Sequence, residues 1–281
     1  PISLRSPGGW RNWQREMPEN DLLIPRRRIE LDADPLAPER ARFVELGLAS
    51  CFSFLRGASD AVDLVLTARA LSYDAIGIAD ANSMAGVVRV HSEAKTLKIK
   101  PVIGCRIETV EGLVFLAYPT DRSAYGRLCR LISAGRMGTL DGGWQDKGVC
   151  DISLAMLADH AEGMQLILIP PRDLDAEFTL SVPGNVVRFR KSGSPEDTKM
   201  KSEVGQGSAA AFVSSCEKKF AFGEALSHLT AQLPTLRHLA AAYLYNGDDI
   251  ARIDRLDALA RANALGLLAT NDSHYVHRHE A

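Results

Sequence analysis

Hydrophobic and polar residues change from an irregular to a regular arrangement near residue 42. Residues 1–41 are rich in proline, arginine and aspartate, and we expect them to form an irregular leader. From there on, apolar runs alternate with segments whose apolar residues recur every three or four positions, which indicates strands and amphipathic helices. The apolar runs predict strands over residues 43–50, 75–80, 100–109, 113–120, 164–171, 236–245 and 265–271, with a weaker candidate at 186–191. The helical periodicity predicts helices over residues 59–71, 83–97, 123–137, 153–161, 209–229 and 247–263.

The order of these elements predicts the fold class. Strands that alternate with helices of about 10–15 residues are typical of βα units around a largely parallel sheet, and this many units favours a barrel. We therefore predict an α/β barrel of about seven strands, in which the strand beginning near Phe43 lies beside the strand ending near Asp272. The stretch 192–208 is polar and rich in glycine and serine, and we expect a mobile loop there.

Composition narrows the choice of environment and partner. The chain has 281 residues, of which 46% are hydrophobic, enough for a sizeable core. Its formal net charge of −2 predicts weak binding to DNA at most, through local patches such as Arg26–Arg28. Five scattered cysteines without a C-x-x-C pair suit a reducing cytoplasm better than a disulfide framework. Apolar runs are too short to cross a bilayer, so we expect a cytoplasmic protein without a membrane partner.

Candidate chemistry concentrates where predicted strands end. No P-loop, no dinucleotide-binding glycine motif after a strand and no G-x-S-x-G motif is present in the sequence. The last apolar run leads into Asp272-Ser273-His274, and the alternation of a strand points the carboxylate and the imidazole to one side. Such a pair is half of a metal site or half of an acid–base pair. Asp80 and Arg106 also fall at strand ends, which favours a common pocket.

Several stretches carry a resemblance to a known family. They are "FVELGLASCFSFLRGAS" (43–59), "AIGIADANSMAGVVRVHSEAK" (75–95), "KPVIGCRIE" (100–108), "LAYPTDRSAYGRLCRLISAGRM" (116–137) and "LLATNDSHY" (267–275). Together they resemble the N-terminal PHP (polymerase and histidinol phosphatase) domain of bacterial C-family polymerases, the relatives of the DNA polymerase III alpha subunit. "FSFLRGAS", "AGVVR" and "AYPTDRSAYGRLCRL" are similar to the error-prone, DnaE-like branch. The resemblance implies a PHP domain over residues 42–281 with a distorted (β/α)7 barrel.

The resemblance also implies where a metal site would lie. Active PHP domains hold zinc or manganese ions with ligands from H-x-H, T-D-H, G-x-E and D-x-H motifs. The expected ligand positions that carry no donor side chain in this chain are Gly47, Ala49 and Ala81. The remnant positions are Asp80, Arg106, Asp272 and His274, with Arg106 in place of the glutamate. We therefore expect no metal and no catalytic residue in this chain, and an Arg106 that pairs with Asp80 or Asp272.

These expectations lead to one hypothesis with two alternatives. The first is a structural PHP domain that braces the body of an error-prone polymerase in damage-tolerant DNA synthesis, with translesion-synthesis proteins as further candidate partners. The magnesium-dependent polymerase domains of this nucleotidyltransferase would lie beyond residue 281, so this chain alone is expected to be inactive. The second is a metal-dependent phosphoesterase or 3′–5′ exonuclease that recruits Glu45, Cys51 and His91 as ligands. The third is a free-standing regulatory interaction module.

Overall fold

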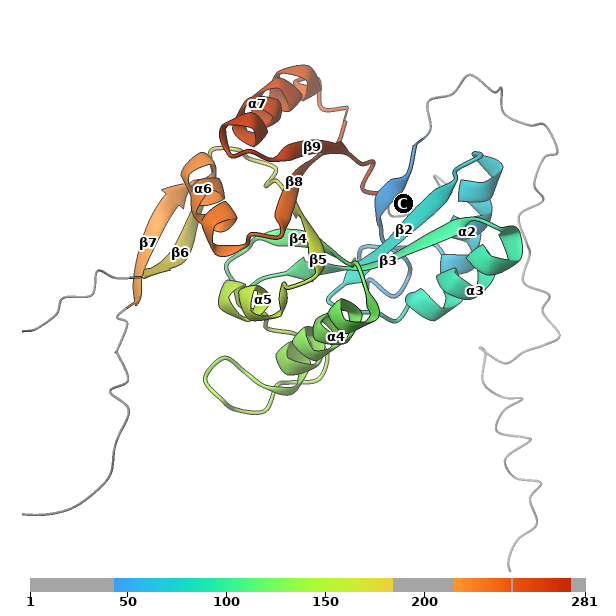
Figure 1. Ribbon diagram of the computed structural model, residues 1–281, viewed down its shortest axis with the longest axis horizontal. Helices are drawn as coiled ribbons and strands as arrows, with labels where there is room; N and C mark the ends of the chain where they lie inside the picture. Colours follow the sequence, from blue (N-terminus) through green and yellow to red (C-terminus); the bar gives the residue numbers. More distant parts are fainter. Residues whose placement is uncertain (1–42, 184–214, 244, 274–281) are drawn as a thin grey trace, which may run out of the picture.

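A curled sheet of seven strands forms the centre of the molecule (Figure 1). The computed structural model describes residues 43–183, 215–243 and 245–273. The expected leader (1–41), the weaker strand (186–191) and the expected mobile loop (192–208) lie outside these ranges. The strands of the sheet, in their spatial order, are β1 (Glu45–Leu48), β2 (Ala75–Ala81), β3 (Lys100–Glu108), β4 (Val114–Pro119), β5 (Met164–Ile169), β8 (Leu236–Ala241) and β9 (Gly266–Ala269).

The sheet is largely parallel, with one reversed strand at its centre. β1, β2 and β3 pair in parallel, and so do β5, β8 and β9. β4 is antiparallel to both of its neighbours, β3 and β5. A tight turn joins β3 to β4 without a crossover helix, and Gly112 takes a positive φ of 83° in it. The two parallel groups therefore run in the same direction and bring their carboxyl ends to one edge of the sheet.

The first and last strands of the sheet approach each other at that edge. The amide of Ala49, just after β1, donates to the carbonyl of Ser273, after β9, over 3.1 Å. The hydroxyl of Thr270 and the amide of Asn271 both donate to the carboxylate of Glu45 on β1. Figure 1 shows β9 turning toward β1. The prediction of an α/β barrel of about seven strands, with these two segments side by side, is confirmed.

Helices cover the convex side of the sheet (Figure 1). They are α2 (Ala61–Ala70), α3 (Val87–Leu97), α4 (Arg122–Met137), α5 (Leu154–His160), α6 (Phe222–Gln232) and α7 (Asp249–Ala262). Side-chain oxygens of Asp60, Asp121 and Ser153 cap α2, α4 and α5 by accepting main-chain amides of the first turn. None of the helices among the described residues is long and apolar enough to span a bilayer.

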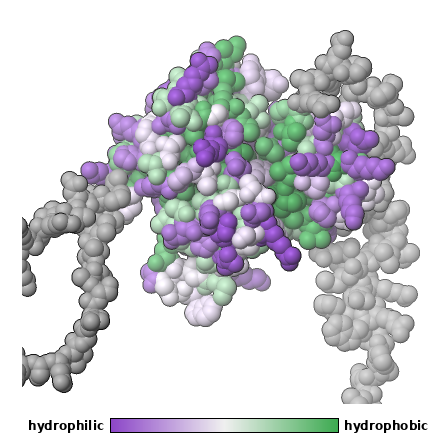
Figure 2. All heavy atoms as spheres, viewed as in Figure 1, coloured by the Kyte–Doolittle hydropathy of each residue, from purple (hydrophilic) through white to green (hydrophobic). Residues whose placement is uncertain are grey.

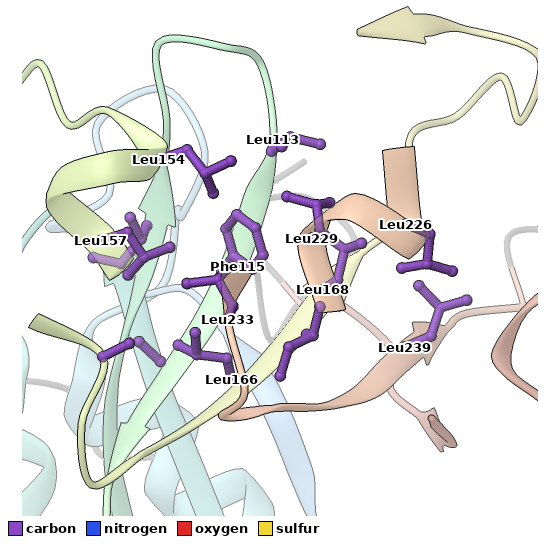
Figure 3. Close-up of a cluster of buried hydrophobic side chains, with 14 of the residues drawn as sticks. Leu113, Phe115, Leu154, Leu157, Leu166, Leu168, Leu226, Leu229, Leu233 and Leu239 are labelled. Atoms are coloured by element: carbon purple, nitrogen blue, oxygen red, sulfur yellow. The ribbon is translucent and has the colours of Figure 1, made fainter. Parts of the chain in front are cut away.

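Two hydrophobic clusters lie between the helices and the sheet. The larger joins β3–β5 and β8 to α4–α7, and Figure 3 shows Phe115, Leu166 and Leu168 of the sheet facing Leu229 and Leu233. The smaller joins β1 and β2 to α2 and α3. On the face seen in Figure 2, hydrophobic residues gather in a band beside the hydrophilic surface over α2 and α3. Burial of the side chains in the two hydrophobic clusters is the main stabilising contribution to the fold.

A third, smaller cluster fills the concave side of the sheet and explains how tightly it curls. It contains Ala79, Leu116, Tyr118, Ile167 and Ala240. The Tyr118 ring crosses β3 where Gly104 leaves room, because a Cβ there would lie only 2.5 Å from the ring. The Tyr118 hydroxyl donates to the carbonyl of Leu46. One aromatic side chain therefore ties β4 to β1 across the interior.

One predicted helix is wrong over residues 215–221. Residues 209–229 were expected to be helical, but β7 (Ser215–Ala221) is a strand and α6 begins at Phe222. β7 forms an antiparallel ribbon with β6 (Glu177–Pro183), a strand that the periodicity did not predict. Phe178 and Leu180 on β6 are buried in the larger cluster. Pairing with a strand that lies far away in the sequence therefore outweighs the helical propensity of the Glu-Lys-Lys segment.

Candidate functional site

Arg106 and Asp272 form an ion pair at the carboxyl edge of the sheet. Arg106 lies near the end of β3 and alternates with Gly104, so its side chain points to the concave side. Its Nη1 donates to Oδ1 of Asp272 over 2.7 Å, and Arg106 is only 5% exposed. Glu108 Oε1 lies 3.5 Å from Nε and also accepts from Arg56 over 2.7 Å. Of the two partners expected for Arg106, the structure brings Asp272 to it.

Asp80 points to the other side of the sheet. It follows Ile76 and Ile78 on β2, which pack against α2 and α3, and strand alternation directs the carboxylate the same way. Its oxygens accept from the amide (2.8 Å) and hydroxyl (2.9 Å) of Ser50 and from the hydroxyl of Ser53 (2.7 Å). The common pocket expected for the strand-end residues thus contains Arg106 and Asp272 but not Asp80.

Glu45 holds the two edges of the sheet together. It is 3% exposed, and its Oε1 accepts from the amide of Gly47 (2.7 Å) and the hydroxyl of Thr270 (2.5 Å). Its Oε2 accepts from the amide of Asn271 (2.8 Å). Three neutral donors therefore satisfy this buried carboxylate, as burial of a charge requires.

Two of the three positions expected to have lost a ligand, Gly47 and Ala49, are closely packed. A Cβ at Gly47 would lie 2.8 Å from Thr270 Oγ1 and 3.3 Å from both Asp272 Cα and Glu45 Oε1. Ala49 is fully buried, and the amide of Ala81 donates to Ser53 Oγ over 3.1 Å. His274, the last of the remnant positions, lies outside the described residues.

The residues proposed for the alternative metal site are not assembled. Cys51 and His91 are both exposed, the latter on α3, whereas Glu45 is buried between β1 and β9. Although Cys51 is exposed as a residue, partial desolvation of its thiol raises the pKa of Cys51, and the nearby Asp60 carboxylate raises it further, which disfavours the metal-binding thiolate. Across the part of the chain that the structure describes, no group of three or more His, Cys, Asp or Glu side chains is placed to hold a metal ion.

A cavity of about 400 Å³ opens beside the ion pair. It lies at the carboxyl ends of β5, β8 and β9, where sites form in barrels of this kind. Its wall is formed by Arg106, Ile169, Pro170, Arg172, Ala240, Ala242, Asn246, Arg252, Leu256, Thr270 and Asp272. Sequence reasoning did not find Arg172 and Arg252. Their only signal is that Arg172 directly follows a predicted strand and Arg252 lies near the start of a predicted helix.

Comparison with known proteins agrees with the fold. A family model described as the PHP domain matches residues 45–201. The error-prone DNA polymerase of Caulobacter vibrioides is 35% identical over 237 residues, which cover 83% of this chain and 17% of that protein. The error-prone DNA polymerase of Rhodopseudomonas palustris is 39% identical over 246 residues, 84% of this chain and 20% of that protein. This chain thus spans a fifth or less of the length of these two relatives.

A solved structure supports the fold independently. The crystal structure of a proposed metal-dependent phosphoesterase from Bifidobacterium adolescentis matches with a TM-score of 0.51. The match covers 84% of this chain and 88% of that one, at 15% sequence identity, which supports the fold alone. The family match over more than half of the chain and the curled seven-stranded sheet lead to the same assignment. The chain belongs to the PHP domain family.

Proposed function

We propose that this chain is the N-terminal PHP domain of an error-prone C-family DNA polymerase in which the ion pair between Arg106 and Asp272 replaces the metal site. We call this ion pair the structural lock. The role of the domain is to brace the polymerase body and to offer a surface to partner proteins, in synthesis that tolerates DNA damage. The polymerase relatives motivate this assignment, since each is several times longer than the segment it shares with this chain. The single observation that carries the structural role is the Arg106–Asp272 ion pair.

The ion pair supports the loss of metal binding by its charge. A guanidinium fixed 2.7 Å from Asp272 occupies a lone pair that a metal ion would need. A permanent positive charge beside a dication is also unfavourable at the low effective dielectric of a buried site.

The packing around Gly47 supports the same proposal by its geometry. A histidine there would need the space that Thr270 Oγ1 and Glu45 Oε1 now occupy. Asp80 is turned to the convex side and saturated by Ser50 and Ser53. The described donor residues therefore do not fit the metal cluster that the family implies, and no catalytic step is assigned through it.

The decisive experiment measures hydrolysis. The purified chain is incubated with single-stranded DNA and with p-nitrophenyl phosphate, in EDTA and in added manganese or zinc. We expect the rate with metal to equal that of the Asp272→Ala variant, because no metal-activated water forms. Manganese-stimulated nucleotide release that vanishes in His274→Ala would instead establish the phosphoesterase or exonuclease alternative.

A further inference from the structure

The loop that follows β1 turns large apolar side chains toward solvent. We call residues 51–57 the apolar loop. Its Phe54 and Leu55 are 87% and 92% exposed, and Phe52 is exposed as well. Val88 on α3 is 75% exposed, and the next residue, Arg89, places its guanidinium over the Phe52 ring, 5.4 Å from the ring centroid. Single apolar residues are common on protein surfaces, whereas a group of neighbouring ones marks a surface that contacts a partner.

Several contacts hold the apolar loop in one conformation. The amides of Arg56 and Gly57 both donate to the carbonyl of Ser53 over 2.9 Å, and the Ser53 hydroxyl donates to Asp80 over 2.7 Å. The Arg56 guanidinium donates to the Glu108 carboxylate, also over 2.7 Å. The exposed side chains are therefore presented on a fixed backbone, which reduces the conformational entropy that is lost when a partner binds.

Leu55 has a backbone conformation that its own surroundings do not explain. Its φ of 59° lies in the left-handed region, which is unfavourable for a bulky residue. Such a conformation persists only where other interactions compensate for it, and it is frequent at binding sites. Almost the whole Leu55 side chain faces solvent, so packing within the described residues compensates little. A contact with a partner that covers this side chain would supply the missing compensation.

The path of the chain indicates which partner lies nearest to the apolar loop. Ala49 lies two residues before this loop, and its amide donates to the carbonyl of Ser273 over 3.1 Å. Ser273 is the last residue that the structure describes, so the polypeptide that follows it starts beside the foot of the apolar loop. The segment shared with the two polymerase relatives makes up 17% and 20% of their length. The greater part of such a polymerase would therefore continue from this point.

We propose that the apolar loop and Val88 form the surface on which the body of the polymerase docks. This inference rests on the proposed function and names the surface through which the domain braces that body. The two arginines of the surface already have carboxylate partners, Glu108 for Arg56 and Asp60 for Arg89. The surface thus presents apolar area with paired charges around it, which fits an apolar recess on a protein and not the phosphate backbone of DNA.

Carbene footprinting, which labels exposed side chains, tests the proposal on two proteins. They are the purified 281-residue chain and the full-length protein that contains it. We expect labelling of residues 52–55 to fall at least about fivefold in the full-length protein, because the anchors of an interface are shielded from solvent. Tyr125 is as exposed as Phe52 but lies at the start of α4, at the opposite edge of the sheet, so its labelling should not change. Equal labelling of residues 52–55 in the two proteins would overturn the proposal.

A substitution of Leu55 separates docking from folding. Asparagine tolerates a positive φ, so Leu55→Asn should leave the unfolding temperature of the 281-residue chain unchanged or raise it. In the full-length protein it should increase labelling of residues 52–54 and accelerate tryptic cleavage between domain and body at least about tenfold, through the loss of one apolar anchor.

Leu71→Asn is the matched control for this substitution. Leu71 is also exposed, but it lies at the far end of α2, at the opposite edge of the sheet. Any loss of stability that it causes should be equal in the 281-residue chain and in the full-length protein. Cleavage that Leu55→Asn accelerates no more than Leu71→Asn does would overturn the proposal.

The outcomes also distinguish this inference from the proposed function. A full-length protein that polymerises DNA while residues 52–55 stay fully labelled would overturn the docking surface alone. The same labelling, together with a 281-residue chain that sediments as a dimer and becomes a monomer in Leu55→Asn, would assign the surface to a second copy instead. A reading frame that ends at residue 281 would overturn both the docking surface and the proposed function.

Discussion

Arg106 and Asp272 lie 166 positions apart in the sequence, yet the guanidinium Nη1 and the carboxylate Oδ1 are 2.7 Å apart. The contact joins β3 to the segment after β9, at the edge of the sheet where Glu45 also connects β1 to that segment. Two polar contacts therefore hold the ends of the curled sheet in place.

Removal of the arginine should destabilise the domain. In Arg106→Gln, Asp272 loses its charged partner while it remains only 24% exposed, and we expect a loss of about 2–3 kcal/mol in the free energy of unfolding. The matched control is Arg261→Gln, which breaks an ion pair to Asp257 in α7 whose arginine is 79% exposed. That change should cost less than about 0.5 kcal/mol. Equal midpoints of urea unfolding for the two variants would show that the buried ion pair stabilises the domain no more than the exposed one.

The Asp80 carboxylate should act as the anchor of the loop that follows β1. Asp80→Asn replaces one acceptor oxygen with a donor that faces Ser50 and Ser53, and we expect a loss of about 1–3 kcal/mol. Amide hydrogen exchange should rise over residues 50–57 and stay unchanged in α4, because the loss is local. Unchanged exchange in the loop would mean that Asp80 does not anchor it.

The crowding at Gly47 can be measured with a single methyl group. Gly47→Ala places a Cβ 2.8 Å from Thr270 Oγ1, so we expect a loss of about 1–3 kcal/mol as the contact to Glu45 is displaced. Gly126→Ala is the control, since it lies inside α4 and a Cβ there meets nothing closer than 3.8 Å. That variant should gain about 0.5–1 kcal/mol from helix propensity. A neutral Gly47→Ala would show that the position has room for a side chain.

Tyr118 should make the fold sensitive to alkali. Burial, with a smaller effect of the nearby Glu45 carboxylate, raises the pKa of this phenol well above 10 in the folded state. The folded chain thus holds the proton after the unfolded chain has lost it, so this stability is present below about pH 10 and falls as pH rises further. The decline should be about 1.4 kcal/mol per pH unit. Tyr118→Phe should be less stable at neutral pH, because the Leu46 carbonyl loses its donor.

Comparison of the wild type with Tyr118→Phe separates the titration of Tyr118 from that of the cysteines, because both proteins contain the same cysteines. The stability difference between the wild type and Tyr118→Phe should shrink steadily above pH 10, and urea midpoints at several pH values measure it. A difference that stays constant up to pH 11.5 would contradict a raised pKa for Tyr118.

The regular part of the fold follows from local patterns. The apolar runs at 75–80 and 164–171 became β2 and β5 because their side chains pack on neighbours wherever the chain pairs them. The first predicted helix begins with a side-chain cap from Asp60, a residue type that favours this position. Strand 215–221 could not be predicted in this way, because its stability comes from pairing with residues 177–183.

The sequence predicted the candidate site only in part, again because contacts between distant segments decide its arrangement. The motif positions located Arg106 and Asp272, but the choice between Asp80 and Asp272 depends on which face each strand turns inward. The contacts of Glu45 depend on closure between segments 225 positions apart, which no local pattern encodes. Ser50 and Ser53 carried a usable signal, since two hydroxyls follow the first strand directly.

The most direct test of the structural lock is the metal content of the purified chain. After equilibrium dialysis against zinc or manganese, elemental analysis should find far less than one ion per chain that depends on Asp272. Asp272→Ala should give the same content as the wild type, since Arg106 and not a metal ion is the partner of this carboxylate. One or more ions per chain that disappear in both Asp272→Ala and His274→Ala would contradict the account.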